Sequence, residues 1–129
     1  MEAKELFRLA SEARRNAYTP YSKFRVGAAL LTKSGRIFTG CNIENATYGA
    51  TCCAERVAIF KAISEGETAF EAIAVQGDNS GPTFPCGICR QVMSEFSQSM
   101  EVILESNEND IEIYTLEDLL PYGFKLSGE

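Results

Sequence analysis

The sequence contains no histidine among its 129 residues. The side chain that proteins use most often for acid–base catalysis near neutral pH and for metal binding is therefore missing. Long apolar runs are missing as well, since no segment reaches the roughly 18 apolar residues of a membrane-spanning helix. The opening MEAKELFRLA also lacks the basic-then-apolar order of a secretory signal peptide. We therefore expect a soluble, cytoplasmic protein with no membrane partner.

Basic residues are scarce in this chain. Lysine and arginine number 12 against 18 aspartates and glutamates, which gives a formal net charge of −6. Proteins that bind nucleic acids usually present a basic face to the phosphates, and the one close basic pair in the sequence is Arg14–Arg15. We therefore expect a neutral small molecule as the ligand and no nucleic-acid partner.

The length of the chain predicts a single domain over residues 1–129. Such a chain can bury a core, but it is short for enclosing a deep pocket by itself. Strands alternate with helices along the sequence, which predicts a three-layer α/β/α domain with a mixed five-stranded sheet. Periodicity and turn residues predict these elements: helix 3–17, strands 24–32 and 36–45, helix 53–65 with Val57, Ile59, Phe60 and Ile63 facing inward, strand 72–78, helix 85–96, strands 101–106 and 111–115, and a short helix 117–120 capped by Thr115 and Asp118.

Cysteine is the most informative residue type. The chain has five, an odd number, and in a reducing cytosol such clusters more often bind metals or act in catalysis than form disulfides. In PCGIC, residues 85–89, Pro85 suits a first helical turn, which places Cys86 and Cys89 on one face near a helix N-terminus. Cys53 stands at the start of the preceding helix in the same way. The positive end of a helix stabilises thiolates, and two such helix starts can meet at the carboxyl edge of a sheet.

Three thiolates at this spacing predict a zinc ion as cofactor. A structural zinc site usually has four protein ligands, whereas a catalytic one has three and keeps a position for water. Cys52 could in principle be a fourth ligand, but adjacent residues such as Cys52 and Cys53 rarely direct their side chains at one metal ion, so we do not expect it to bind. Cys41 is interpreted as a small buried apolar residue. A structural zinc site is the main alternative, and a redox C-x2-C motif is disfavoured because no thioredoxin-like context surrounds it.

Glu55 and Arg56 follow the first of these cysteines. Without histidine, a carboxyl group beside the metal must both accept and donate protons, and Glu55 is placed for this task. Three thiolates give the zinc site a net negative charge, which Arg56 would offset. Each residue also has an ordinary interpretation, a helix-start carboxylate for Glu55 and a solvated surface charge for Arg56.

These motifs together resemble those of a known family. Cys53-Ala54-Glu55 followed by PCGIC matches the signature of the zinc-dependent nucleoside and nucleobase deaminases. The segments YSKFRVGAAL, GCNIENATYGA, CAER and PCGICRQV are similar, in particular, to the short, homotetrameric type of cytidine deaminase. The resemblance extends from Tyr18 to about Phe124. Two departures are Ile88, where alanine is usual, and the tail LLPYGF, where alanine often precedes the phenylalanine.

The resemblance implies hydrolytic deamination of cytidine and 2′-deoxycytidine to the uridines with release of ammonia, in pyrimidine salvage. It implies that Glu55 takes a proton from the attacking water, protonates the ring nitrogen and then protonates the departing amine. It also implies roles for other residues: Cys53, Cys86 and Cys89 as zinc ligands, Arg56 as the partner of the thiolates, Asn42 and Glu44 at the ribose hydroxyls, Phe24 on the base, the Ala54 backbone at the exocyclic amine, and Tyr48 and Phe124 in the site of a neighbouring subunit.

Two other functions remain open from the sequence. One is deamination of a cytosine-containing antibiotic such as blasticidin S, against which Glu44 argues, because a carboxylate beside Asn42 suits free ribose hydroxyls. The other is a structural zinc-binding module, in which Glu55 would have no catalytic task. Editing of RNA or DNA bases is disfavoured by the acidic charge and the short loops.

Overall fold

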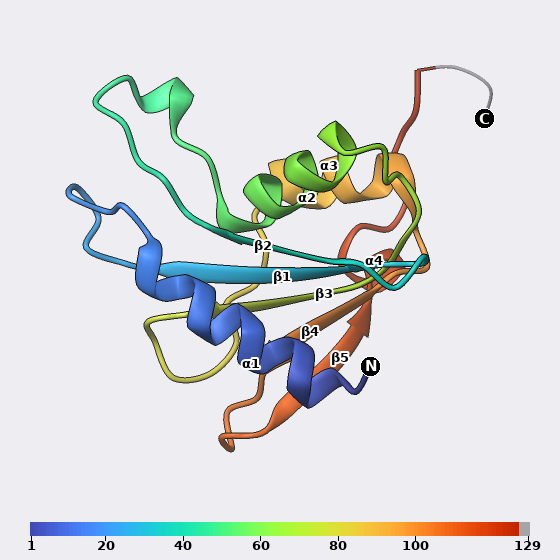
Figure 1. Cartoon of the computed structure of the whole chain (residues 1–129), viewed down its shortest axis with the longest axis horizontal. Coiled ribbons are helices and arrows are strands. Elements are labelled where there is room, and N and C mark those ends of the chain that lie inside the picture. Colours follow the sequence, from blue (N-terminus) through green and yellow to red (C-terminus); the bar gives the residue numbers. More distant parts are fainter. Residues whose placement is uncertain (127–129) are drawn as a thin grey trace.

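The computed structural model describes residues 1–126 as one mixed sheet with helices on both of its faces (Figure 1). The elements along the chain are α1 (Ala3–Ala13), the 3-10 turn η1 (Arg14–Asn16), β1 (Val26–Thr32), β2 (Ile37–Cys41), the 3-10 turn η2 (Tyr48–Ala50), α2 (Ala54–Ser64), β3 (Phe70–Gly77), α3 (Gly87–Phe96), β4 (Glu101–Glu105), β5 (Ile111–Thr115) and α4 (Leu116–Leu119). None of the helices in this part of the chain combines the length and apolar character needed to cross a bilayer.

The five strands lie in the order β2-β1-β3-β4-β5. β1 is antiparallel to both β2 and β3, β3 is parallel to β4, and β4 is antiparallel to β5. Strands β2, β3 and β4 therefore run in one direction, although β1 separates β2 from β3. The carboxyl ends of β2 and β3 lie at the same edge of the sheet, and the chain leaves each of them to start a helix, α2 or α3. The predicted mixed five-stranded sheet is confirmed.

The helices divide between the two faces, as the predicted three layers require. In Figure 1, α1 crosses one face while α2 and α3 lie on the other. Leu6 and Ala10 of α1 pack on Ala29, Ala72 and Ile103 of the sheet. The larger core lies under α2 and α3 and combines residues of both helices with all four of the strands β1 to β4; its fully buried members include Leu30, Ile59, Phe70, Ile73, Met93 and Leu104.

Helix α2 lies close to the sheet, and its packing corrects one prediction. A Cβ added to Gly40 of β2 would come within 2.5 Å of the Ala54 carbonyl oxygen and 2.6 Å of the Ala58 amide nitrogen, so only glycine permits this approach. At this separation small side chains fill the interface, and Ala54, Ala58 and Ala62 are fully buried. The predicted inward position of Phe60 is wrong: its side chain is 48% exposed.

Several predicted boundaries also move. The α-helical part of the first helix ends at Ala13, and a 3-10 turn continues it. The third helix begins at Gly87, so Pro85 precedes the helix instead of occupying its first turn, and Cys86 is the N-cap with extended backbone at φ −70° and ψ 171°. The predicted capping box is confirmed, because Thr115 accepts from the Asp118 amide and Asp118 accepts from the Thr115 amide.

Candidate active site

Three cysteine sulfurs meet where α2 and α3 begin. Cys53 is the N-cap of α2, Cys86 is the N-cap of α3, and Cys89 lies in the first turn of α3. Their sulfur atoms all lie within 4.8 Å of one another, and those of Cys53 and Cys86 are 3.7 Å apart. The amide of Cys89 also points at the Cys86 sulfur, at 3.5 Å. The convergence predicted for these two helix starts is therefore confirmed.

The geometry of the three sulfurs fits zinc. Two thiolates at the usual Zn–S distance of about 2.3 Å in a tetrahedral arrangement are roughly 3.8 Å apart, which agrees with the Cys53–Cys86 separation. A three-sulfur set is the ligand chemistry that zinc prefers, and it leaves one coordination position for another ligand. Among the residues that the structure describes, no other cysteine joins the cluster: Cys41 ends β2, and the backbone of Cys52 pairs with Ile43.

The surroundings of the cluster favour a thiolate at Cys53. The Cys89 thiol, and then the guanidinium of Arg56, lower the pKa of Cys53 to about 5 by hydrogen bonding, in spite of burial. Nη2 of Arg56 donates to the Cys53 sulfur at 3.5 Å. Contact with Cys53 and burial raise the pKa of Cys89. Within residues 1–126, the buried Nε of Arg56 has no hydrogen-bond partner, so this side chain is directed to the sulfurs and not to a network of surface acceptors.

Glu55 lies in the first turn of α2, directly after the N-cap cysteine. It is only 4% exposed. Burial raises its pKa to about 7, and the negative charge of Cys53 adds to the rise, while its own backbone N–H and Arg56 act in the opposite direction. A carboxyl group that exchanges protons near neutral pH is suited to general acid–base catalysis, and pKa values shifted in this way are common in active sites.

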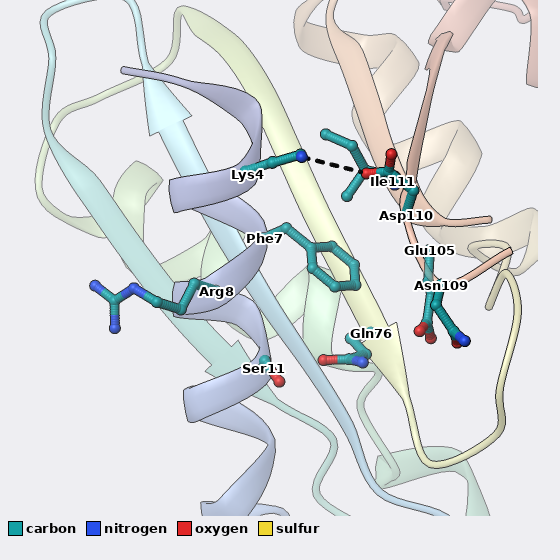
Figure 2. A pocket seen from close by; sticks show the side chains of 9 residues that line it. All are labelled: Lys4, Phe7, Arg8, Ser11, Gln76, Glu105, Asn109, Asp110 and Ile111. Atoms are coloured by element: carbon teal, nitrogen blue, oxygen red, sulfur yellow. Dashed lines mark hydrogen bonds and ion pairs between the residues drawn. The ribbon is translucent and has the colours of Figure 1, made fainter.

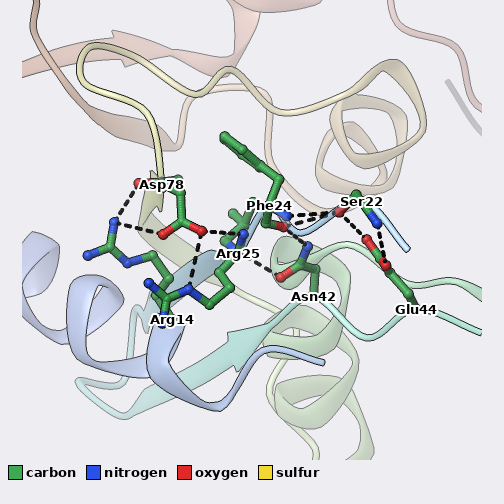
Figure 3. Close-up of polar contacts among 9 residues, drawn as sticks. Arg14, Ser22, Phe24, Arg25, Asn42, Glu44 and Asp78 are labelled. Carbon is green, nitrogen blue, oxygen red and sulfur yellow. Dashed lines mark hydrogen bonds and ion pairs between the residues drawn. The ribbon is translucent and has the colours of Figure 1, made fainter. Parts of the chain in front are cut away.

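Asn42 and Glu44 follow β2 and bind the segment before β1. The amide of Asn42 accepts from the Val26 backbone at 2.9 Å and donates to the Phe24 carbonyl at 2.9 Å. The Glu44 carboxylate is buried and accepts from the hydroxyl and amide of Ser22 and from the amide of Tyr21. The side chains of Asn42 and Glu44 thus form a row of polar contacts beside the loop that carries Phe24 (Figure 3), and we call this row the polar seam.

The other residues singled out in the sequence lie around this seam and the cluster. Ala54 is fully buried at the start of α2, and Phe24 is half-buried. Tyr48, in η2, is 81% exposed, and Phe124, in the tail, is 62% exposed. The segments of residues 18–25 and 42–53 extend beyond the same end of the sheet, at the left of Figure 1, and a hollow of roughly 290 Å³ lies between them, lined by Tyr21, Ser22, Glu44, Asn45, Tyr48 and Thr51.

Sequence patterns missed two residues that support this region. Asp78 follows β3 and binds Arg25, 53 positions away in the chain. Arg90 donates to the carbonyl of Pro85 at 2.7 Å and to that of Leu119 at 2.7 Å, which ties the turn before Cys86 to the start of the tail. The position of Arg90 inside the segment PCGICRQV could have pointed to a role for this residue. Asp78 belongs to no motif, so no sequence signal pointed to it.

A separate groove of roughly 370 Å³ lies on the opposite face of the sheet. Figure 2 shows it between Phe7 on α1, Gln76 at the end of β3 and the β4–β5 turn, with Lys4 paired to Asp110 at 3.6 Å at one end. None of the cysteines of the cluster, and none of the residues predicted to act in catalysis or binding, lines this groove. The chemistry-bearing residues therefore belong to the other side of the molecule.

Comparison with known proteins agrees with the geometry. Residues 1–105 match the family model described as the cytidine and deoxycytidylate deaminase zinc-binding region. A cytidine deaminase of Sporosarcina psychrophila is 52% identical, over 96% of this chain and 92% of its own. A blasticidin-S deaminase of Bacillus cereus is 34% identical, over 93% of this chain and 90% of its own. The crystal structure of a cytidine deaminase from Burkholderia pseudomallei superposes with a TM-score of 0.90 at 48% identity, over 96% of this chain and all of that one. The chain therefore belongs to the cytidine and deoxycytidylate deaminase family and carries the zinc-binding site of that family in Cys53, Cys86 and Cys89.

Proposed function

We propose that this protein catalyses the hydrolytic deamination of cytidine and 2′-deoxycytidine to uridine and 2′-deoxyuridine, with release of ammonia, as a step of pyrimidine salvage in the cytoplasm. The observation that carries the proposal is the buried carboxyl group of Glu55 beside a three-sulfur zinc site. A structural zinc site would give no reason to bury an ionisable group there, because burial of a carboxylate without a partner is costly.

In the proposed reaction Glu55 moves the protons. When bound by the three cysteines, Zn²⁺ supplies Lewis-acid activation of a water molecule. Glu55 removes one proton from the attacking water and delivers it to the ring nitrogen as the water oxygen bonds to C4. It then takes the second proton from the hydroxyl on C4 and gives it to the exocyclic amine as the C–N bond breaks. One water is consumed and one ammonia is released, so Glu55 returns to its starting state. The pKa of about 7 suits both accepting and donating a proton near neutral pH.

The substrate would be bound along the polar seam. Phe24 packs on the cytosine ring, the Ala54 backbone meets the exocyclic amine, and Asn42 and Glu44 meet the ribose hydroxyls. The ionised state of Glu44 supports this role, because the Ser22 hydroxyl and the backbone amides of Ser22 and Tyr21 lower its pKa. A carboxylate has room for about four hydrogen bonds, and three come from this segment, so it can accept one from a sugar hydroxyl.

We further propose that the sites are shared in a homotetramer. Exposure of Tyr48 and Phe124 supports this proposal, since large aromatic side chains with little cover are typical of interfaces. Both would enter the site of a neighbouring subunit. Sedimentation of the zinc-loaded protein is expected to give a tetramer. A fully active monomer would refute the shared site.

Turnover assays with alternative substrates test the function. Cytidine, 2′-deoxycytidine and blasticidin S are each added to purified, zinc-replete protein, and the ultraviolet change and ammonia release are followed. Turnover of both nucleosides is the expected result. Blasticidin S is included because the chain is 34% identical to a blasticidin-S deaminase. Turnover of blasticidin S alone would replace the proposed substrate but keep the proposed chemistry. Turnover of none of them would leave a structural zinc module as the function.

A further inference from the structure

The end of β3 holds the segment that carries Phe24. Oδ2 of Asp78 accepts from the Arg25 backbone N–H at 2.8 Å and from Nε of the same arginine at 3.2 Å. Arg14 approaches the other carboxylate oxygen at 3.7 Å and donates to the carbonyl of Gly77 at 2.6 Å. Figure 3 shows these contacts running from Arg14 of η1, through Asp78, to Arg25, the residue after Phe24.

Side chains bind the backbone N–H groups of Phe24, Arg25 and Val26 and the carbonyl of Phe24. The hydroxyl of Ser22 accepts from the Phe24 N–H at 3.0 Å. Asn42 bonds to the Phe24 carbonyl and to the Val26 N–H. Asp78 takes the one amide that lies between these, that of Arg25. Since β1 begins only at Val26, no strand ladder holds Phe24 and Arg25. Asp78, directly after β3, supplies the one bond of this set that comes from the end of that strand.

The ring of Phe24 also rests on the end of β3. A Cβ added to Gly77 would be 2.7 Å from the Cζ atom and 2.9 Å from the Cε2 atom of the ring, closer than side chains normally approach. The ring therefore lies directly against the backbone of the residue before Asp78. Two adjacent residues, Gly77 and Asp78, therefore contact the ring of Phe24 and the backbone beside it.

We infer that Asp78 is a positioning residue that sets the affinity for the cytosine base by holding Phe24, and that it acts through its bond to the Arg25 amide. The inference rests on the proposed function, in which Phe24 packs on the base. Asp78 does not touch the reacting atoms, so its loss weakens substrate binding and leaves the proton transfers of Glu55 intact. The ion pairs to the two arginines contribute little. The Arg25 side chain is about half exposed, so solvent screens its charge, and Arg14 lies 3.7 Å from the carboxylate, beyond hydrogen-bond distance.

Steady-state kinetics with cytidine test the inference. Asp78→Ala is expected to raise KM about five- to tenfold, the net contribution of a typical intramolecular hydrogen bond, with kcat within about twofold. Asp78→Asn keeps an acceptor for the Arg25 amide and is expected to restore most of the lost affinity. Arg25→Ala removes the ion pair but keeps that amide, and it serves as the matched control with a near-normal KM.

A double-mutant cycle separates positioning from a general structural effect. In a Phe24→Ala background, the further change Asp78→Ala is expected to alter KM by less than about twofold, because the residue through which it acts is gone. An equal KM increase in both backgrounds would overturn the inference, as would a fall in kcat with an unchanged KM. An Asp78→Asn protein as impaired as Asp78→Ala would overturn the assignment to this hydrogen bond.

A spectroscopic measurement decides the inference even if the proposed activity fails. Wild-type protein that does not turn over cytidine would refute the proposed function. The ring of Phe24 can still be followed by NMR of ring-labelled phenylalanine, with its resonances assigned from the Phe24→Ala spectrum. Asp78→Ala is expected to shift and broaden these resonances, whereas Arg25→Ala leaves them in place. Unchanged Phe24 resonances in Asp78→Ala would refute the positioning role.

Discussion

Arg56 donates to the sulfur of Cys53 at 3.5 Å, one helical turn along α2 from it. The contact places a permanent positive charge against a site whose three thiolates would otherwise leave bound zinc with a net negative charge. The cysteines in turn raise the pKa of Arg56, first through the hydrogen bond to Cys53, so its charge is secure. We therefore expect Arg56 to tune the metal site from the same turn of helix that carries the first ligand.

Replacing Arg56 by glutamine is expected to lower kcat/KM by about tenfold or more. Without the cation, the uncompensated thiolate charge weakens the Lewis acid, and the attacking water becomes less acidic. A rise of one unit in the pKa of this water corresponds to about 1.4 kcal/mol, or about tenfold. The acidic limb of the pH–rate profile should move to higher pH. Arg36→Gln, which removes an exposed arginine paired with Glu65, is the control. A normal profile in Arg56→Gln would show that the charge plays no part.

Glu55→Gln is expected to keep the fold and the zinc content while turnover falls by about 10² to 10⁴ or more, because one residue serves several proton transfers. Metal analysis and the thermal unfolding midpoint establish that the site is intact. Burial is what raises the pKa of Glu55, so the neutral glutamine should cost no stability at neutral pH. Turnover within tenfold of the wild type would contradict the role assigned to this carboxyl.

Removal of zinc by a chelator should lower the unfolding temperature. A metal at 1,000 times its dissociation constant stabilises the folded state by about 4 kcal/mol, and its loss leaves three sulfurs crowded at two helix starts. Added Zn²⁺ should restore stability, whereas Mg²⁺, which prefers oxygen ligands, should not. Cys52→Ser is the matched control and is expected to bind zinc normally, while Cys53→Ser is not.

The carboxylate of Glu44 should make stability depend on pH. Its pKa is lowered in the folded protein, mainly by the Ser22 hydroxyl. The ionised group therefore stabilises the fold above the unfolded-state pKa of about 4.3, and this contribution is lost as the pH falls through the folded-state pKa. The difference in unfolding temperature between wild type and Glu44→Gln should be largest near neutral pH and should shrink below about pH 4. Glu71→Gln, at an exposed position of β3, controls for simple loss of charge.

Gly40→Ala tests whether the close approach of α2 to β2 forms the site. The added methyl would meet the backbone of α2 at 2.5–2.6 Å, so the helix must shift, at a cost of about 1 to 3 kcal/mol. Zinc affinity should fall with stability, because Cys53 moves with the helix. Gly49→Ala adds the same methyl where nothing lies within 4 Å and should leave both quantities unchanged.

The sequence was sufficient for the sheet and for the three ligands, because strand periodicity and cysteines at helix starts are local patterns. It misjudged Phe60, since the apolar pattern of α2 does not reveal that the interface is made of alanines opposite Gly40. It could not reveal Asp78 or the bonds from Asn42 and Glu44 to residues 21–26, because polar contacts between distant segments leave no periodicity. Long-range polar contacts depend on the final arrangement of the strands.

The order β2-β1-β3 also has a consequence for how the protein matures. Cys53 and Cys86 are 33 residues apart, and their helices follow two strands that β1 separates. Neighbouring strands are about 4.8 Å apart, so β2 and β3 lie roughly 10 Å apart, which is also the spacing of two packed helices. In the folded protein, the two helix starts meet across the width of β1. We therefore expect metal capture to come late in folding, so the rate of zinc uptake during refolding should report completion of the sheet.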